Sequence, residues 1–176
     1  MTHETKVIAD EGKQELFIIR EFDAPRELIF KAFTTPEILE EFFSPSPERA
    51  TMQFIHHDYR PGGSYRWCNK DKNGNVLCTF YGVIHDIIAP EKIIYTSEFM
   101  EIPERGNVVT ECISFEELPG GGTKLTIQDV CLNVETRDAI IKSGMGKGLV
   151  AIFLRLDELL PRLKASDILN EEELSR

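Results

Sequence analysis

One segment near the C-terminus constrains the fold more than any other part of the chain. Between residues 149 and 163, apolar side chains recur with the spacing of a single helical face, and charged side chains take the opposite side. The apolar positions are Leu149, Ile152, Phe153, Leu156, Leu159, Leu160 and Leu163. Such a stripe is stable only when it packs against another apolar surface. The rest of the chain must therefore supply a large apolar face for this helix.

The region before this helix has the pattern of an antiparallel sheet. A first strand is predicted over Glu15–Phe22, and six further strand-like runs are separated by short turn signals, of which Asn73-Gly74 is the strongest. These runs are Met52–His57, Ser64–Asn69, Val76–Ile88, Lys92–Met100, Val108–Glu116 and Thr123–Leu132. Short connections favour antiparallel neighbours. We therefore predict a curved meander of about seven strands around the C-terminal helix.

Three shorter helical segments complete the expected order of elements. Two follow the first strand, over residues 25–33 and 36–43, and each has a proline near its first position, where the missing N–H costs nothing. Residues 135–142 are expected to form a further turn or two of helix, and the glycine-rich residues 143–148 to be flexible. Because a sheet that wraps one helix cannot fill its interior everywhere, the arrangement also predicts an apolar cavity.

Length and composition fit a single domain. The chain has 176 residues, of which 41% are hydrophobic and 28% charged, and these values are typical of globular proteins rather than disordered ones. We expect the domain to span residues 15–163, between an N-terminal arm (residues 1–14) and a C-terminal tail (residues 164–176). No apolar run approaches the roughly 20 residues that cross a membrane, and the N-terminus lacks an apolar signal core. A cytoplasmic protein is therefore expected.

Charge and cysteine content narrow the classes of partner. The chain has 30 acidic and 20 basic residues and a net charge of -10, which repels phosphate backbones, so nucleic-acid binding is not expected. The cysteines show no C-x-x-C spacing, so a structural zinc site is not expected. No other metal and no cofactor is expected either. Cytoplasmic cysteines are normally reduced. Cys68 and Cys78 are equidistant from Asn73, and one interpretation is that they face each other across a hairpin and form a disulfide. The favoured interpretation is that they are two small buried apolar side chains.

Several short motifs, taken in order, resemble one known family. They are Phe22-Asp23-Ala24-Pro25-Arg26-Glu27, Thr35-Pro36-Glu37, Arg60-Pro61-Gly62-Gly63, Gly82, Ala89-Pro90-Glu91-Lys92-Ile93, Gly122-Thr123-Lys124-Leu125-Thr126 and Gly148 with the helix behind it. Together they resemble the SRPBCC superfamily, which is START-like and birch-pollen-allergen-like. Within it they are similar to the branch of activator of heat-shock protein 90 ATPase homologues. The chain departs from that branch where tryptophans are usual, because it carries Phe30, Phe42 or Phe43, and Leu149.

The resemblance implies an α+β helix-grip fold that hosts many functions. The leading hypothesis is a binding protein for a small hydrophobic or aromatic molecule held in an internal cavity. The resemblance also implies, as an alternative, a partner of a heat-shock protein 90 chaperone. A third hypothesis is an enzyme, such as a cyclase or hydrolase, that uses a cavity carboxylate. A homodimer is compatible with each of the three.

Polar residues on otherwise apolar strand faces are the candidates for chemistry. Alternation puts Glu111 on one face with Ile113, and Asp129 on one face with Ile127. If these faces look inward, both carboxylates border the cavity, where burial raises the pKa of a carboxyl group. The alternative is that they lie near strand ends, in solvent or paired with a lysine or arginine.

Aromatic residues on the strands either fill the core or line the cavity, where a ring with a polar tip can orient a ligand. Combined with the carboxylate argument, they give five predicted ligand-binding residues: Trp67, Tyr95, Glu111, Phe42 and Phe153. His56-His57-Asp58 looks like a metal or catalytic cluster, but neighbouring strand residues point to opposite faces. Strict alternation leaves only His56 and Asp58 on one face, and we expect ordinary hydrogen bonding there.

Overall fold

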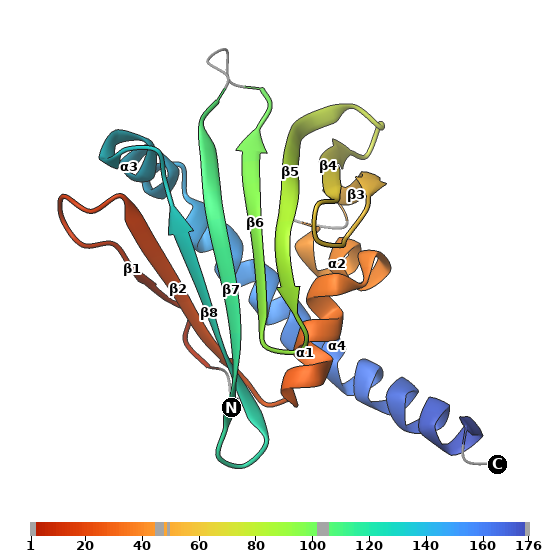
Figure 1. The fold of residues 1–176 in the computed structure, drawn as a ribbon. Coiled ribbons are helices and arrows are strands. Elements are labelled where there is room, and N and C mark those ends of the chain that lie inside the picture. Colours follow the sequence, from red (N-terminus) through yellow and green to blue (C-terminus); the bar gives the residue numbers. More distant parts are fainter. Residues whose placement is uncertain (1–2, 45–47, 49, 102–105, 175–176) are drawn as a thin grey trace.

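An eight-stranded antiparallel sheet curves around one long helix in the computed structural model, which describes residues 3–44, 48, 50–101 and 106–174 (Figure 1). The strands are β1 (Lys6–Ile8), β2 (Glu15–Phe22), β3 (Ala50–His57), β4 (Ser64–Asp71), β5 (Val76–Ile88), β6 (Lys92–Phe99), β7 (Val108–Leu118) and β8 (Gly122–Val130). The helices are α1 (Arg26–Thr34), α2 (Pro36–Phe43), α3 (Val134–Lys142) and α4 (Met145–Leu174). The predicted α+β helix-grip architecture is confirmed.

The sheet is a meander to which the N-terminal strands are added at one side. Its order is β1-β2-β8-β7-β6-β5-β4-β3, and every neighbouring pair is antiparallel. The connection from β2 to β3 carries α1 and α2, which cover one end of the concave face (Figure 1). None of the described helices is both long and apolar enough to span a membrane.

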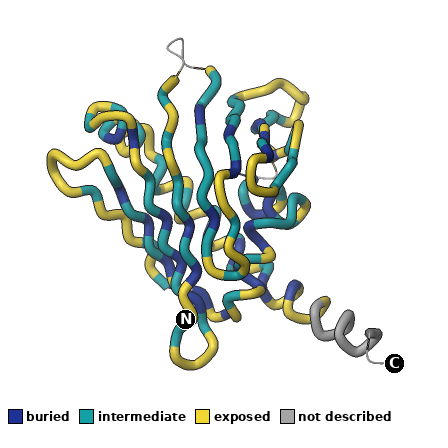
Figure 2. Tube along the Cα trace, viewed as in Figure 1, coloured by how far each residue is buried: buried dark blue, intermediate teal, exposed yellow. Residues whose placement is uncertain are grey.

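The helix α4 lies across the concave side of the sheet, as its apolar stripe predicts (Figure 1). Phe153, Leu156, Leu160 and Leu163 are buried in the main hydrophobic core, and the other three members of the stripe pack against it. The sheet contributes inward-facing residues to the same core, among them Ile18, Phe115 and Leu125. Buried residues gather where α1 and α4 approach the sheet, while the upper parts of the strands are mostly half-buried (Figure 2).

Two elements differ from the sequence prediction. The strand β1 is an additional edge strand, whose three exposed residues pair with Phe17–Ile19 of β2. It is too short to produce a recognisable alternation of apolar and polar residues. The glycine-rich stretch 143–148 is not flexible throughout, because α4 already begins at Met145. Gly144, with a φ of 87°, forms the turn that separates α4 from α3.

The hairpin between β4 and β5 is not symmetric about Asn73, and this corrects the expected facing of two cysteines. Cys68 is aligned with Thr79, and Cys78 with Asn69, because the register shifts beside Asn69. Direct cross-strand facing of Cys68 and Cys78 is therefore wrong. All four cysteines are free thiols in this structure.

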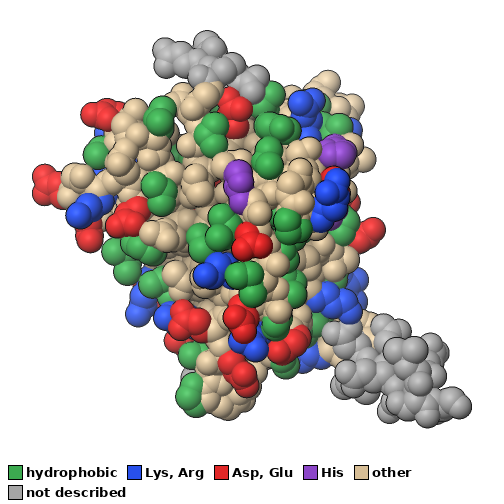
Figure 3. Space-filling view, in the orientation of Figure 1, with side chains coloured by type: hydrophobic (Ala, Val, Ile, Leu, Met, Phe, Trp, Pro, Cys, Tyr) green, Lys and Arg blue, Asp and Glu red, His purple; other side chains and the backbone are tan. Residues whose placement is uncertain are grey.

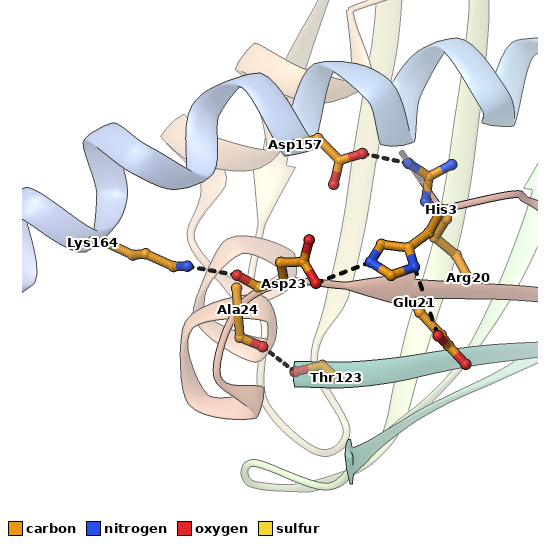
Figure 4. A network of polar contacts seen from close by, with 8 residues as sticks. All are labelled: His3, Arg20, Glu21, Asp23, Ala24, Thr123, Asp157 and Lys164. Carbon is orange, nitrogen blue, oxygen red and sulfur yellow. Dashed lines mark hydrogen bonds and ion pairs between the residues drawn. The ribbon is translucent and has the colours of Figure 1, made fainter. Parts of the chain in front are cut away.

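A polar network joins the N-terminal segment, β2 and α4 (Figure 4). Arg20 on β2 is only 1% exposed, and its guanidinium pairs with Asp157 on α4 and donates to Thr5 Oγ1 at 3.0 Å. His3 Nε2 lies 3.0 Å from Asp23 Oδ1 at the end of the same strand region. Because an unpaired buried charge is strongly destabilising, the contact between Arg20 and Asp157 helps to fix where α4 crosses the sheet.

Candidate functional site

A small aromatic pocket lies on the concave face, between α1, α2 and strands β3 to β7. Its lining residues are Phe33, Leu39, Phe43, Phe54, Tyr59, Tyr65, Trp67, Tyr95 and Ile113. Every lining residue except Leu39 and Ile113 is aromatic. The cavity volume is about 50 Å³. This space holds a few water molecules, at roughly 10–15 Å³ each on the same measure, and is well below the roughly 300–1,000 Å³ of drug-sized sites.

The two sides of the pocket differ in how firmly they are held. Its inner side is formed by buried residues, including Phe33 and Ile113, which belong to the main core. Its outer side is formed by half-buried aromatic residues, which are Phe43, Phe54, Tyr59, Trp67 and Tyr95. The outer side is therefore closer to solvent than the inner side.

One wall of the pocket depends on a close fit between Tyr65 and Gly82. Tyr65 on β4 is aligned with Gly82 on β5, and its hydroxyl donates to the carbonyl oxygen of Thr96 at 2.9 Å. A Cβ atom at Gly82 would lie 1.9 Å from that carbonyl oxygen and 2.5 Å from the Tyr65 ring. Glycine is thus required here for the close approach of a ring and a neighbouring strand.

Two carboxylates lie in a row with Tyr95 beside this pocket. The register aligns Tyr95 of β6 with Glu111 of β7, and Glu111 with Asp129 of β8. The Tyr95 hydroxyl donates to Glu111 Oε2 at 2.7 Å. Asp129 Oδ1 is buried without a hydrogen-bond partner, and neither acid forms an ion pair with a lysine or arginine among the described residues. We call Tyr95, Glu111 and Asp129 the acidic row.

Burial shifts the titration of the whole acidic row. Desolvation, with repulsion from Glu111, raises the pKa of Asp129 well above its ordinary value of 3.8. Desolvation also raises the pKa of Glu111, although hydrogen bonds from Tyr95 and Ser97 oppose this shift. The pKa of Tyr95 is raised as well, by desolvation first and then by the Glu111 charge. Each group therefore resists becoming charged while no cation is present.

A β-bulge in β3 precedes His57, whose ring packs on two residues of the pocket lining. The register of β3 and β4 shifts between Phe54 and His56, and a bulge of this kind re-aims the side chains that follow it. His57 stacks on Tyr59 with ring centroids 5.0 Å apart, and its ring lies 4.6 Å from Phe54. The bulge interrupts the alternation only between Phe54 and His56, and beyond it His56 aligns with exposed Arg66 while His57 aligns with buried Tyr65. Burial lowers the pKa of His57, and its Nε2 has no partner among the described residues.

The five predicted ligand-binding residues fall into two groups. Trp67 and Tyr95 line the pocket, and Glu111 is joined to it through Tyr95. Phe42 and Phe153 are instead fully buried in the main core and do not line the pocket. Both occupy the interior, but on the core side rather than the pocket side. Ligand binding by any of the five stays a prediction.

Sequence analysis did not identify part of the pocket. Phe54 and Tyr59 belong to the lining, and both rings contact His57. The register shift between β3 and β4 lies between Phe54 and His56. No turn motif or periodicity in the sequence predicts that bulge. Within the described part of the chain, no group of three His, Cys, Asp or Glu side chains is placed to hold a metal ion.

Comparisons with known proteins agree with the architecture. Three solved structures similar to this chain come from Mycobacterium smegmatis (23% identity, TM-score 0.78, 89% of this chain and 97% of that chain), Rhodobacter sphaeroides (20%, 0.78, 90% and 99%) and Nitrosomonas europaea (26%, 0.74, 90% and 99%). No curated protein matches the chain. A family model described as "Activator of Hsp90 ATPase homolog 1-like protein" matches residues 23–161. The chain therefore belongs to the Activator of Hsp90 ATPase homolog 1-like family.

Proposed function

We propose that this protein binds a small aromatic molecule in the pocket on its concave face. The observation that carries the proposal is an almost wholly aromatic lining whose Tyr95 leads, through Glu111, to the unsatisfied buried oxygen of Asp129. Ordinary core packing satisfies its buried polar atoms. A site for a ligand instead combines apolar walls with a few polar groups that fix orientation, and the acidic row provides such groups.

The pocket must widen before it can hold a ring. Its volume of about 50 Å³ is smaller than the roughly 150 Å³ of an engineered apolar cavity that binds benzene. The half-buried rings of Phe43, Tyr59 and Trp67 form the side that can move, and rotamer changes of this kind are common when ligands bind. We therefore expect ligands with a single small ring rather than drug-sized molecules.

A fluorescence titration tests the proposal, because Trp67 is the only tryptophan in the chain and lines the pocket. Adding 2-phenylethanol should change the Trp67 emission along a saturable curve. Leu39→Phe, which fills the pocket from α2, should remove that response. The matched control Leu154→Phe changes a leucine that is 38% exposed on α4, and it should respond as the wild type does.

Two results of this titration contradict the proposal. One is a wild-type emission that does not saturate. The other is an identical saturable response in folded Leu39→Phe, which would place the binding event outside the pocket. Circular dichroism spectra of both variants establish that they are folded.

We propose, as a second function, that the outer surface binds a heat-shock protein 90 chaperone. The family description supports this function. The outer face of the sheet mixes apolar and charged side chains (Figure 3), and Val108 and Val130 are among its exposed apolar residues. Purified chaperone should be retained by the immobilised chain in a nucleotide-dependent manner. Absence of retention, with and without ATP, removes this function.

A further inference from the structure

We infer that the occupant of the pocket is a small aromatic amine, with its protonated nitrogen between Glu111 and Asp129 and its ring against Tyr95 and Trp67. This inference rests on the proposed aromatic pocket and adds the chemical class of its ligand. It is carried by the position of the acidic row, by the unsatisfied oxygen of Asp129 and by the aromatic surroundings.

The acidic row begins at the pocket, because Tyr95 belongs to the lining and Glu111 and Asp129 follow it on the next two strands. Ile113 lines the pocket, and Glu111 lies two residues before it on the same face of β7. Tyr95 both lines the pocket and donates to Glu111. The charge of Glu111 also reaches the other hydroxyls of the lining, because its repulsion contributes, after desolvation, to the raised pKa values of Tyr59 and Tyr65.

One acceptor of the acidic row lacks a hydrogen-bond donor, and a protonated amine would supply one. Asp129 Oδ1 is a buried acceptor without a donor, and such a group costs about 1–3 kcal/mol. A protonated amine carries up to three N–H donors and can reach both facing carboxylates with charge-assisted hydrogen bonds. An alcohol supplies one donor and no charge. A carboxylate ligand supplies no donor and is repelled.

Within the described structure, no lysine or arginine of the protein itself forms an ion pair with Glu111 or Asp129. Arg137, which follows β8 in the chain, is occupied by Asp138 and by the carbonyl oxygen of Asp10. Arg155 on α4 has a buried Nη1 without a partner. Among the described residues, Arg155 forms no ion pair with Glu111 or Asp129. The two facing acids are therefore left for an external cation.

The aromatic lining favours the same class of ligand. A cation near the face of a tyrosine or tryptophan ring is attracted by the electrons of that ring, and aromatic cages recognise ammonium groups in this way. Tyr95 is hydrogen-bonded to Glu111, and Trp67, which stacks on Phe80, is a second aromatic ring of the same lining. The net charge of -10 also draws cations toward the protein as a whole.

Isothermal titration calorimetry with three probes of similar shape tests this inference. The probes are 2-phenylethylamine (cationic), 2-phenylethanol (neutral) and phenylacetate (anionic). At pH 7 and physiological salt, the amine should bind the wild-type protein at least about tenfold more tightly than the alcohol, a difference of about 1.4 kcal/mol. The anion should bind most weakly.

Three variants locate the effect. Asp129→Asn and Glu111→Gln keep the shapes of the two acids and should each reduce amine affinity about tenfold while leaving the alcohol nearly unchanged. Glu117→Gln removes the same charge from an exposed position of β7 and should leave both affinities unchanged. Thermal melts followed by circular dichroism establish folding, and each single acid variant gives an independent reading if the other fails to fold.

The outcomes separate this inference from the proposed function. If no probe binds, the aromatic pocket and the amine inference both fail. If the alcohol binds as tightly as the amine, the pocket stands and the amine inference is overturned. A loss of amine affinity in Glu117→Gln equal to that in Asp129→Asn also overturns it, because general charge attraction would then explain the preference.

Discussion

At the residue scale, Asp129 is a buried carboxyl group whose raised pKa makes the stability of the fold depend on pH. The pKa of Asp129 is raised above 3.8 in the folded protein. As the pH rises above that value, the unfolded chain releases its proton first, while the folded chain retains it. The folded state therefore binds more protons, and the free energy of unfolding falls with rising pH until the folded pKa is passed.

The variant Asp129→Asn removes this dependence. We expect its free energy of unfolding to match the wild type near pH 4 and to exceed it by on the order of 1 kcal/mol at pH 8, as is common when a functional group that opposes stability is replaced. Urea unfolding followed by circular dichroism between pH 4 and pH 8 measures the difference. A constant difference, or one that shrinks as the pH rises, contradicts the assignment of a raised pKa to Asp129.

The glycine beneath Tyr65 gives a second prediction at this scale. Gly82→Ala forces a Cβ atom into the Thr96 carbonyl oxygen and the Tyr65 ring, so the free energy of unfolding should fall by about 1–3 kcal/mol or more. Gly148→Ala is the matched control, since a Cβ atom there meets nothing within 4 Å. Because Gly148 lies within α4, that change should instead stabilise by about 0.5–1 kcal/mol. Chemical denaturation that ranks the two variants in the opposite order contradicts the close fit.

At the scale of elements, the sequence predicts that α4 packs on the sheet, because its apolar residues all lie on one side of the helix. The strands were readable for a similar reason, since alternation and turn residues mark them. The bulge in β3 and the short edge strand β1 were not readable. Both depend on how neighbouring strands accommodate each other, and neither produces a periodic signal in its own residues.

Two leucines on α4 test the packing of that helix. Leu156 is fully buried and Leu154 is 38% exposed. Leu156→Ala should lower the free energy of unfolding by about 2–5 kcal/mol, and Leu154→Ala by no more than about 0.5 kcal/mol. Equal losses in urea denaturation would mean that the helix does not present this face to the sheet.

At the scale of the whole molecule, the pocket lies where α1 and α2 meet β3, β4, β6 and β7, at the end of the hydrophobic core. Strand alternation predicts an inward face for Glu111, and the aromatic character of Trp67 and Tyr95 predicts that they fill the core or line a cavity. The sequence does not distinguish these pocket residues from the core residues Phe42 and Phe153, since all five are large or polar residues on inward faces. That separation depends on where the core ends, and it needs the three-dimensional packing of distant segments.

The most direct test of the account is a titration of 15N-labelled protein with 2-phenylethylamine, followed by NMR. The single tryptophan gives one indole N–H resonance, from Trp67. We predict that this resonance and the backbone amides of Tyr95, Glu111 and Ile113 shift together along one saturable curve. An unmoved Trp67 indole, or shifts confined to outer-face residues such as Val108 and Val130, would contradict binding in the concave pocket.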